Sequence, residues 1–313
     1  MNKVTAVIAA SVCAVSLFGA AEEPEEEVKK GLVQQMHDIF EAGFDVDFFS
    51  TYVWRSAVQN DEPVIEPCVW ADLTYFNPFW LGFSIWQNYD LTPRRHSVLM
   101  GGLTETDYNV HVGATAWESD GETMFLDVEV GHEWYVNQRV RGENDDLKNT
   151  SELYAKVTFK NEIANVYGQA SWMYDDFGSY RQSFYYELGL KREFDLLAPL
   201  ELPEETLLFG LDWNLGFGDS RYLYYLYGGV DRSTDEFGEE TYSNPTAGVG
   251  GTTVKAYLTW NITEWMSLVG TIAYTGVLNG SARQALGDAG TGWQGDPYRR
   301  DLLWGGLSLK FKF

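Results

Sequence analysis

Apolar and polar residues alternate with a period of two over most of this chain. Residues 302–313, LLWGGLSLKFKF, show the pattern clearly: from Leu303 onward every second residue is apolar or glycine, and Lys310 and Lys312 fall on the other face. Successive side chains of a β-strand point to opposite faces. The segment therefore predicts a strand with one apolar face and one polar face, ending on the aromatic Phe313.

The same alternation recurs along the chain in segments of roughly ten residues, the length that a tilted membrane-spanning strand requires. None of these segments is apolar on both faces, as the central strands of large soluble β-proteins often are. The pattern predicts an all-β protein, a transmembrane antiparallel up-and-down β-barrel of about 12 strands. The expected strands are 43–56, 63–76, 79–90, 103–117, 122–136, 151–160, 163–174, 181–193, 206–218, 252–261, 265–277 and 302–313.

The connections between these strands alternate in length. Short connections are expected at 77–78, 118–121, 161–162 and 262–264, whereas the one at 194–205 is longer. The intervening connections are mostly long and polar or rich in glycine; they span 91–102, 136–150, 219–251 and 278–301, with short exceptions at 57–62 and 175–180. Short turns at the periplasmic end and long loops at the outer end are typical of outer-membrane barrels.

The N-terminal segment has the features of an export signal. Lys3 precedes an apolar run over 4–18, and Gly19 and Ala21 fit cleavage after Ala21. We therefore expect a signal peptide at 1–21, a periplasmic linker or short helix at 22–42, and the barrel at 43–313. A plug inside the lumen is a further interpretation of 22–42.

Composition agrees with a barrel at a membrane. Aromatic residues make up 16% of the chain, with 12 Trp and 19 Tyr, and Trp and Tyr gather at membrane interfaces. After cleavage Cys68 is the one remaining cysteine, so no intramolecular disulfide is expected. The formal net charge of −24 argues against nucleic acid as a partner.

The polar faces of the predicted strands are expected to line the lumen. The earlier strands contribute mostly acids and the later ones most of the bases, and barrel closure would bring Lys310 and Lys312 to face Asp45 and Asp47. Two interpretations remain open: an ion-pair network that fills a narrow interior, or a transverse field across a water-filled pore. The predicted pore-lining residues are Asp45, Asp47, Arg55, Glu66, Asp72, Glu105, Asp107, His111, Asp127, Glu129, Glu133, Lys156, Lys160, Arg181, Glu187, Lys191, Asp212, Lys255, Lys310 and Lys312.

Three short motifs carry a resemblance to a known family. FFSTYVWRS at 48–56, ETDYNV at 105–110 and GHEWY at 131–135 resemble conserved hypothetical outer-membrane barrel proteins in which an early strand reads S-x-Y-x-[WF]-R-G. Here Ser56 stands where that family usually has glycine. The strand count is also similar to that of twelve-stranded channels specific for nucleosides or acidic oligosaccharides. The latter would imply a lumen rich in arginine, and only two arginines are expected to point inward.

The C-terminal strand resembles the terminal signature of bacterial outer-membrane barrels. This resemblance implies insertion by the barrel-assembly machinery through Phe313, a location in the bacterial outer membrane, and contact with its lipid and lipopolysaccharide.

No catalytic arrangement is recognisable. The four histidines are His37, His96, His111 and His132, and no G-x-S-x-G or comparable nucleophile motif accompanies them. We expect no enzyme and no cofactor. Acidic clusters within 143–146 and 231–240 offer oxygen atoms suited to Ca²⁺ or Mg²⁺, but without EF-hand spacing they are expected to be solvated loop charges.

The sequence thus predicts a passive, porin-like channel for small polar solutes. The alternatives are a closed structural or surface-binding barrel without transport and, less favoured, an outer-membrane hydrolase. The two main hypotheses differ in whether the lumen is open.

Overall fold

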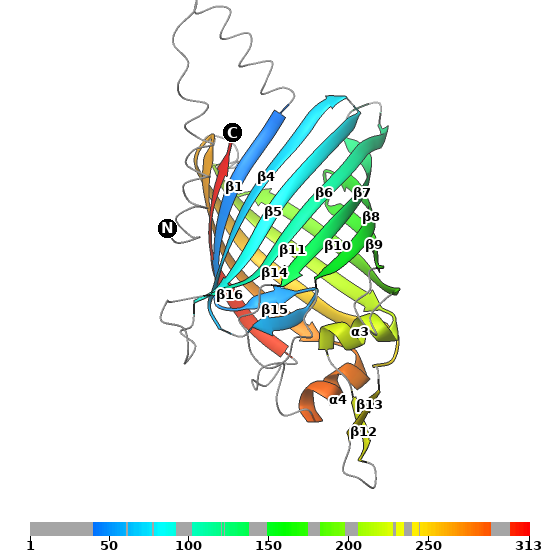
Figure 1. The fold of residues 1–313 in the computed structure, drawn as a ribbon. Helices are drawn as coiled ribbons and strands as arrows, with labels where there is room; N and C mark the ends of the chain where they lie inside the picture. The colour runs from blue at the N-terminus through cyan, green and yellow to red at the C-terminus, as the bar shows by residue number, and fades with distance from the viewer. Residues whose placement is uncertain are drawn as a thin grey trace, which may run out of the picture. The chain divides into compact units, whose positions relative to one another are not determined.

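Twelve strands form a closed antiparallel barrel (Figure 1), as the alternation predicts. The computed structural model describes residues 40–60, 62–76, 78–91, 102–119, 121, 123–137, 149–174, 182–197, 206–227, 230–234, 240–243, 245–288 and 301–313. The barrel strands are β1 (Phe40–Phe49), β4 (Val64–Phe76), β5 (Phe79–Asp90), β6 (Gly102–Glu118), β7 (Met124–Asn137), β8 (Thr150–Asn161), β9 (Asn165–Met173), β10 (Ser183–Asp195), β11 (Leu207–Gly218), β14 (Gly248–Thr263), β15 (Met266–Val277) and β16 (Asp301–Lys312). The expected signal peptide and all but the last residues of the expected linker lie outside the described residues.

The barrel closes between its first and last strands. β1 pairs with β16 from Gly43 opposite Lys312 to Phe49 opposite Gly306. The terminal Phe313 extends this pairing, since its backbone N–H donates to the carbonyl oxygen of Ala42 at 2.8 Å. The predicted short connections lie at the end of the barrel where β1 begins and β16 finishes, which we call the turn end. The opposite end, where β1 leads out of the wall, is the loop end.

The first strand differs from its expected bounds. β1 begins at Phe40 and ends at Phe49, whereas the alternation predicts 43–56. The continuation of the pattern belongs to a separate two-stranded hairpin, β2 (Tyr52–Trp54) and β3 (Ala57–Asn60). A hairpin strand alternates with the same period as the wall strand, so the pattern alone does not reveal that the chain leaves the wall after Phe49.

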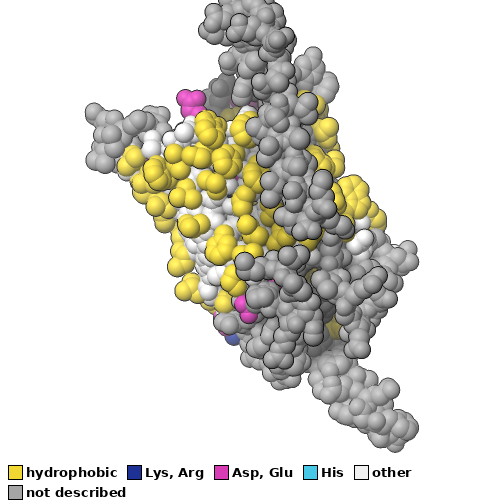
Figure 2. Space-filling model, turned by 60° about the vertical axis from the view of Figure 1, so that its left-hand side comes forward, with side chains coloured by type: hydrophobic (Ala, Val, Ile, Leu, Met, Phe, Trp, Pro, Cys, Tyr) yellow, Lys and Arg dark blue, Asp and Glu magenta, His cyan; other side chains and the backbone are white. Residues whose placement is uncertain are grey.

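The outer wall is apolar. Figure 2 shows hydrophobic side chains spread over the described face of the barrel. Such side chains come from strands all around the barrel, and those at least two-fifths exposed include Phe48, Val69, Phe83, Val112, Val130, Val157, Val166, Tyr186, Trp213, Leu258, Ile272 and Leu307. A continuous apolar outer surface of this kind is typical of a barrel surrounded by lipid.

Aromatic rings cover glycines on the inner wall. In five places a large ring lies opposite a glycine of the neighbouring strand, so close that a Cβ added there would be within 3.0 Å of it. The ring then lies along the wall and leaves more of the lumen free. The pairs are Gly43 with Trp70, Gly113 with Trp80, Gly131 with Tyr154, Gly189 with Tyr167, and Gly210 with Tyr257.

The loop end carries additional elements that the alternation does not predict. These are α3 (Ser220–Tyr227), the hairpin of β12 (Val230–Thr234) and β13 (Glu240–Ser243), and α4 (Gly280–Asp288). Asp219 caps α3, because its Oδ1 accepts hydrogen bonds from the backbone N–H groups of Arg221 at 3.0 Å and Tyr222 at 2.8 Å. None of the helices among the described residues is long and apolar enough to cross a bilayer.

Candidate pore and its inner hairpin

The β2–β3 hairpin is built around a tight turn at Arg55 and Ser56. Trp54 pairs with Ala57, and the two residues between them have φ angles of 49° and 62°. Two successive left-handed residues define a type I′ turn, which matches the twist of a two-stranded ribbon. Neither residue is glycine, although left-handed conformations are costly for other residues. The turn is therefore held by contacts made by these two side chains.

Arg55 makes the principal contact of the hairpin. Its guanidinium donates two hydrogen bonds to the Glu152 carboxylate on β8, one of them from Nη1 to Oε2 at 2.8 Å, and a weaker one to Ser171 Oγ at 3.3 Å. The two charged side chains are 8% and 0% exposed. Burial lowers the pKa of Arg55, but the Glu152 carboxylate outweighs that effect, so the pKa is raised overall and the guanidinium stays charged.

Aromatic rings surround the Arg55 guanidinium. Its Cζ atom lies 4.6 Å from the ring centroid of Trp54, 4.5 Å from that of Tyr185 and 5.3 Å from that of Tyr222. Cations placed over aromatic faces are stabilised by the ring quadrupole, more strongly when water is excluded. The Tyr222 hydroxyl also donates to Glu152 at 3.0 Å. The helix α3 thereby joins the buried ion pair at the loop end.

The other turn residue bonds to different strands. Ser56 Oγ lies 2.9 Å from Thr253 Oγ1 on β14 and donates to Asn214 Oδ1 on β11 at 3.4 Å. Thr253 in turn contacts Thr275 on β15 at 3.0 Å. Because Arg55 bonds to β8 while Ser56 bonds to β11 and β14, the turn is anchored to separate parts of the wall. Figure 1 shows the hairpin at the same end of the barrel as α3.

An apolar cluster backs the hairpin. Ala57 packs in a core with Tyr222, Leu223 and Leu226 of α3, and Trp54 packs against that core. At the start of the hairpin, the Tyr52 ring lies 5.4 Å from that of Trp86, and its hydroxyl donates to Glu105 on β6 at 2.9 Å. The hairpin therefore lies inside the barrel, where it narrows the lumen at the loop end.

The predicted pore-lining residues separate into groups. Arg55 belongs to the hairpin turn and not to a wall strand, which corrects its predicted position, and Arg181 lies outside the described residues. Near the loop end, the inward positions include Asp47, Glu66, Glu105, Asp107, Glu133 and Glu187. Toward the turn end, they include Asp45, Asp72, His111, Asp127, Glu129, Lys156, Lys160, Lys191, Asp212, Lys255, Lys310 and Lys312.

Acids and bases toward the turn end pair across neighbouring strands. Asp127 meets Lys160 with 2.7 Å between oxygen and nitrogen, and Asp45 meets Lys310 at 3.8 Å. Lys312 pairs with Glu41 on β1. The expectation that Lys312 faces Asp47 is therefore wrong: Asp47 lies opposite Ser308 in the β1–β16 register, because the antiparallel pairing places Lys312 beside the start of β1.

A cavity of about 320 Å³ opens inside this part of the lumen. Acidic and basic side chains both reach it, and Trp80 forms an aromatic part of its wall. The space can hold several water molecules or a small polar solute. Its lining residues are Asp72, Trp80, His111, Asp127, Glu129, Lys156, Thr158 and Lys160.

The bases of the barrel wall are unevenly placed along the barrel axis. The strand segments at the loop end contain no lysine or arginine among the described residues, whereas the lysines and arginines of the described wall strands lie at the middle of their strand or nearer the turn end. The bases also keep to β8, β10, β14 and β16, whereas β1, β4, β5, β6 and β7 have none among their described residues, as the order of the strands predicts. The loop-end segments are 46–49, 64–70, 85–90, 102–109, 131–137, 150–155, 170–173, 183–188, 213–218, 248–254, 272–277 and 301–306.

Several residues of the hairpin site have no clear sequence signal. Tyr52, Ser56, Thr253 and Tyr222 are ordinary members of alternating or loop segments, and their contacts span between 53 and 197 positions of the chain. The one hint is Ser56, at the position where the resembled family usually has glycine. The positive φ of Ser56 is the backbone conformation for which glycine is best suited.

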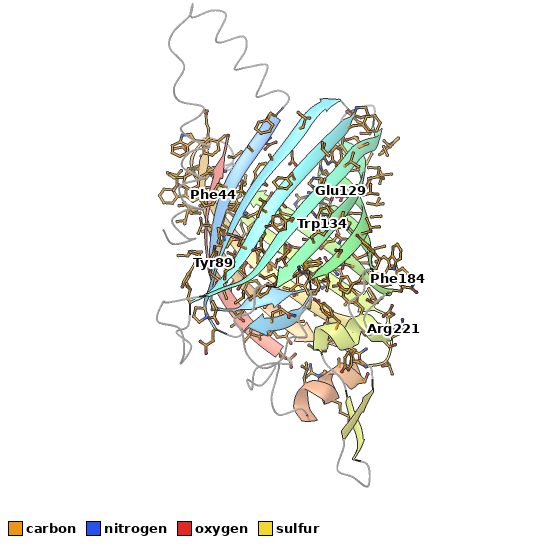
Figure 3. All side chains as sticks on the ribbon, in the orientation of Figure 1. Phe44, Tyr89, Glu129, Trp134, Phe184 and Arg221 are labelled. Carbon is orange, nitrogen blue, oxygen red and sulfur yellow. The ribbon has the colours of Figure 1, made fainter. Side chains whose placement is uncertain are left out.

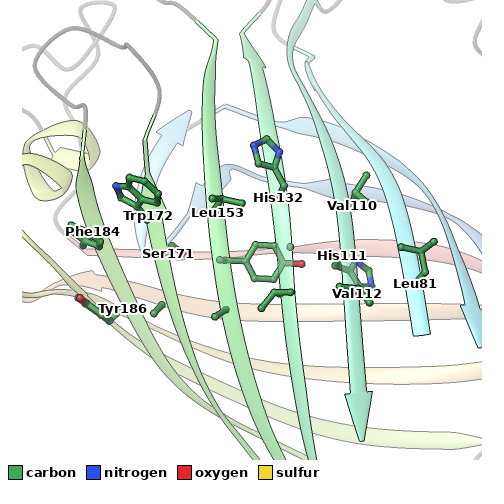
Figure 4. Close-up of a pocket in the computed structure, with 15 residues that line it drawn as sticks. Leu81, Val110, His111, Val112, His132, Leu153, Ser171, Trp172, Phe184 and Tyr186 are labelled. Atoms are coloured by element: carbon green, nitrogen blue, oxygen red, sulfur yellow. The ribbon is translucent and has the colours of Figure 1, made fainter. Parts of the chain in front are cut away.

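The outer wall has a shallow groove of about 600 Å³ (Figure 4), lined largely by outward side chains that include Leu81, Val110, Val130, Trp172 and Phe184. His132 lies at this groove, on the outer face as expected, with its Nε2 2.5 Å from the Tyr174 hydroxyl. His111 lies on the inner face, with its Nδ1 2.9 Å from Asn109 Oδ1 and its Nε2 3.6 Å from Asp72 Oδ1.

In the part of the chain that the structure describes, no group of three or more His, Cys, Asp or Glu side chains is arranged to hold a metal ion. The acidic positions 143–146 lie outside the described residues, as do 235, 236 and 239.

No protein-family model matches the chain, and no curated protein matches it in sequence. Among solved structures, it is similar to outer membrane phospholipase A from Escherichia coli, with 11% identity and a TM-score of 0.46 over 86% of this chain and 89% of that one. It is also similar to the NanC porin, with 10% identity and a TM-score of 0.46 over 86% of this chain and all of that one. A similarity to Pseudomonas aeruginosa OccK11 has 11% identity and a TM-score of 0.36 over 88% of this chain and 66% of that one. These similarities are too distant to assign an activity.

Proposed function

We propose that this chain is a bacterial outer-membrane channel for small polar solutes, in which the β2–β3 hairpin forms the constriction. The observation that carries the proposal is the contrast between the two faces of the barrel wall. Outward side chains are apolar, whereas inward positions bear charges, and a polar cavity of about 320 Å³ lies inside. A polar interior is what a water-filled pathway requires.

The membrane location is supported by the outer face. In Figure 3 the labelled residues include Phe44 and Phe184, which belong to outward positions of β1 and β10. Phe44 stacks on Phe311 of β16 with ring centroids 6.4 Å apart. Contacts with lipid and lipopolysaccharide, and insertion by the barrel-assembly machinery through Phe313, belong to the same proposal. Phe313 is half exposed beside the seam between β1 and β16.

The hairpin gives the proposed channel a constriction close to the loop end. Its residues bond to β6, β8, β11 and β14, so a solute entering at that end must pass the hairpin. Isolated two-stranded hairpins are marginally stable in water. The docked position of this one therefore depends on its contacts with the wall, and loss of those contacts would widen the lumen.

A barrel that is closed and does not transport is the second candidate. It is favoured by the buried pair of Arg55 with Glu152 and by the apolar cluster around Ala57, both of which resist movement of the hairpin. In this candidate the barrel would act as a scaffold or as a surface-binding protein.

Conductance in planar bilayers separates the two candidates. Purified wild-type barrel is compared with a variant in which residues 52–60 are replaced by a flexible glycine-serine linker. A channel with a hairpin constriction is expected to conduct weakly as wild type and much more strongly as the variant. If neither protein conducts although both are folded and inserted, transport is excluded and the closed barrel is favoured.

The proposal includes no catalytic role. His111 interacts with Asp72 and Asn109 on the inner wall, while His132 interacts with Tyr174 on the outer wall. Neither contact resembles a hydroxyl or thiol nucleophile held by a histidine that a carboxylate orients. Incubation with phospholipid and peptide substrates tests this part, and turnover that disappears in His132→Ala would overturn it.

A further inference from the structure

Five carboxylates gather on the inner wall beside the hairpin. Asp47 lies directly opposite Glu66 in the pairing of β1 with β4. The charged groups that act on Asp107 are the carboxylates of Glu105, Glu133 and Glu66. We call these five residues the acidic group; they are Asp47, Glu66, Glu105, Asp107 and Glu133.

The hydrogen-bond donors that reach the acidic group are neutral. Tyr52 donates to Glu105 at 2.9 Å, and Asn88 donates to Glu66 at 3.1 Å. The Tyr135 hydroxyl donates to Glu133 at 2.9 Å. These bonds satisfy individual oxygen atoms, but they bring no positive charge to the group.

Arg55, the base that acts on this group among the described residues, is already engaged. Arg55 acts on Glu133 through its charge, but it directs its hydrogen bonds at Glu152 and Ser171. The wall segments at this end supply no other lysine or arginine among the described residues. Five carboxylates therefore share one base among the described hairpin and wall segments at this end.

Two oxygen atoms of the group point to a missing ligand. Asp47 Oδ1 and Asp107 Oδ1 are buried and have no hydrogen-bond partner within the described part of the chain. The Asp107 residue is 8% exposed. A buried carboxylate oxygen without a donor is unfavourable, and a bound cation removes that cost.

We propose that the acidic group is a binding site for a small monovalent cation, either an alkali-metal ion or a primary ammonium group, with Asp107 as its main ligand. Each unpartnered oxygen atom offers an acceptor that a singly charged ion or an ammonium N–H can occupy. On the basis of the proposed channel function, small cations would then be the solutes preferred at the constriction.

Near the turn end, in contrast to the acidic group, carboxylates have basic partners within the protein. Asp127 has Lys160 at 2.7 Å and also accepts a hydrogen bond from Thr115 at 2.9 Å. Its charge is compensated within the protein, so no added cation is needed there. Asp127→Asn is therefore the matched control for Asp107→Asn, because both changes replace an inward, largely buried aspartate by its amide.

Thermal unfolding in detergent tests the site without any need for conduction. The unfolding midpoint is measured in chloride salts of potassium, methylammonium and the bulky N-methylglucamine at equal ionic strength, which separates binding from screening. Wild type is expected to unfold at a higher temperature in potassium or methylammonium than in N-methylglucamine. That difference is expected to disappear in Asp107→Asn and to persist in Asp127→Asn.

The outcomes separate the ligands and the two proposals. Stabilisation by potassium alone identifies an alkali-metal site, and stabilisation by methylammonium alone identifies an ammonium site. Equal midpoints of wild type in all three salts, or a difference that persists in Asp107→Asn, would overturn the cation site. Asp47→Asn serves as a second variant should Asp107→Asn not fold. A barrel that binds the cation but does not conduct would contradict the proposed channel function and leave the cation site standing.

Discussion

The ion pair between Arg55 and Glu152 is expected to control whether the hairpin stays docked. Arg55→Ala leaves the Glu152 carboxylate, which is 0% exposed, without its guanidinium partner. Removing one member of a buried ion pair typically costs about 3–5 kcal/mol. Tyr222 would still donate to Glu152 at 3.0 Å, so the lower part of that range is the safer expectation.

This cost is expected to fall on the docking of the hairpin. The barrel wall is a closed set of twelve paired strands, whereas β2 and β3 pair only with each other. Two strands alone are marginally stable. A destabilisation of about 3 kcal/mol corresponds to roughly a 150-fold increase in the undocked population, since 1.4 kcal/mol is a factor of ten.

Cysteine labelling measures that population. Ala57, which is 2% exposed in the docked hairpin, is replaced by cysteine after Cys68→Ser has removed the thiol of the described barrel. The rate of maleimide labelling at position 57 is expected to rise about 150-fold in Arg55→Ala, in proportion to the undocked population. Lys160→Ala removes a cation that pairs with Asp127 far from the hairpin, so it should leave the rate unchanged.

A double variant tests whether the unpaired Glu152 carboxylate is what undocks the hairpin. Arg55→Met combined with Glu152→Met removes both charges of the pair, and such replacements are often neutral. Slow labelling should therefore return in the double variant. An unchanged labelling rate in Arg55→Ala would refute the claim that this ion pair holds the hairpin.

Three further variants test separate parts of the fold. Gly131→Ala places a methyl group against the Tyr154 ring and is expected to cost about 1–3 kcal/mol in thermal unfolding; Gly168→Ala, whose Cβ would be 3.5 Å from the nearest side chain, should be close to neutral. Ser56→Val puts a β-branched residue at a φ of 62° and removes the hydroxyl contact with the wall, so labelling at position 57 should accelerate. Asp219→Ala removes the cap of α3 and should cost about 1 kcal/mol, seen as faster amide exchange in that helix; equal exchange would contradict the role of the cap.

The sequence allowed the barrel to be predicted because each wall strand faces two different surroundings. Residues 122–136 alternate between apolar residues and Asp127, Glu129 and Glu133, and the structure has β7 there, from Met124 to Asn137. The same period placed the predicted end of the first strand too late, because the alternation continues into β2 after the chain has left the wall. The turn at Arg55 and Ser56 lacks the Asn-Gly or Asp-Gly signal that commonly marks a type I′ turn.

The arrangement of charge was harder to predict for a geometric reason. Grouping the inward residues by strand order suggested acids on one side of the lumen and bases on the other. Neighbouring strands run in opposite directions, however, so Glu152 at the start of β8 lies near the loop end while Lys160 at its other end lies near the turn end. Strand order places the bases on β8, β10, β14 and β16, and position along each strand adds that they lie at its middle or toward the turn end.

Contacts across the barrel have no local signal. Arg55 and Glu152 are 97 positions apart, and Ser56 and Thr253 are 197 apart. Those pairs depend on where the hairpin enters the lumen, which the period of two does not determine.

Single-channel recording of the hairpin-replaced barrel tests the central claim most directly. With residues 52–60 exchanged for a glycine-serine linker, the wall strands remain and the constriction is removed. We expect stable openings much larger than any seen with wild type. A folded, inserted variant that remains closed in every salt would contradict a solute pathway through this lumen.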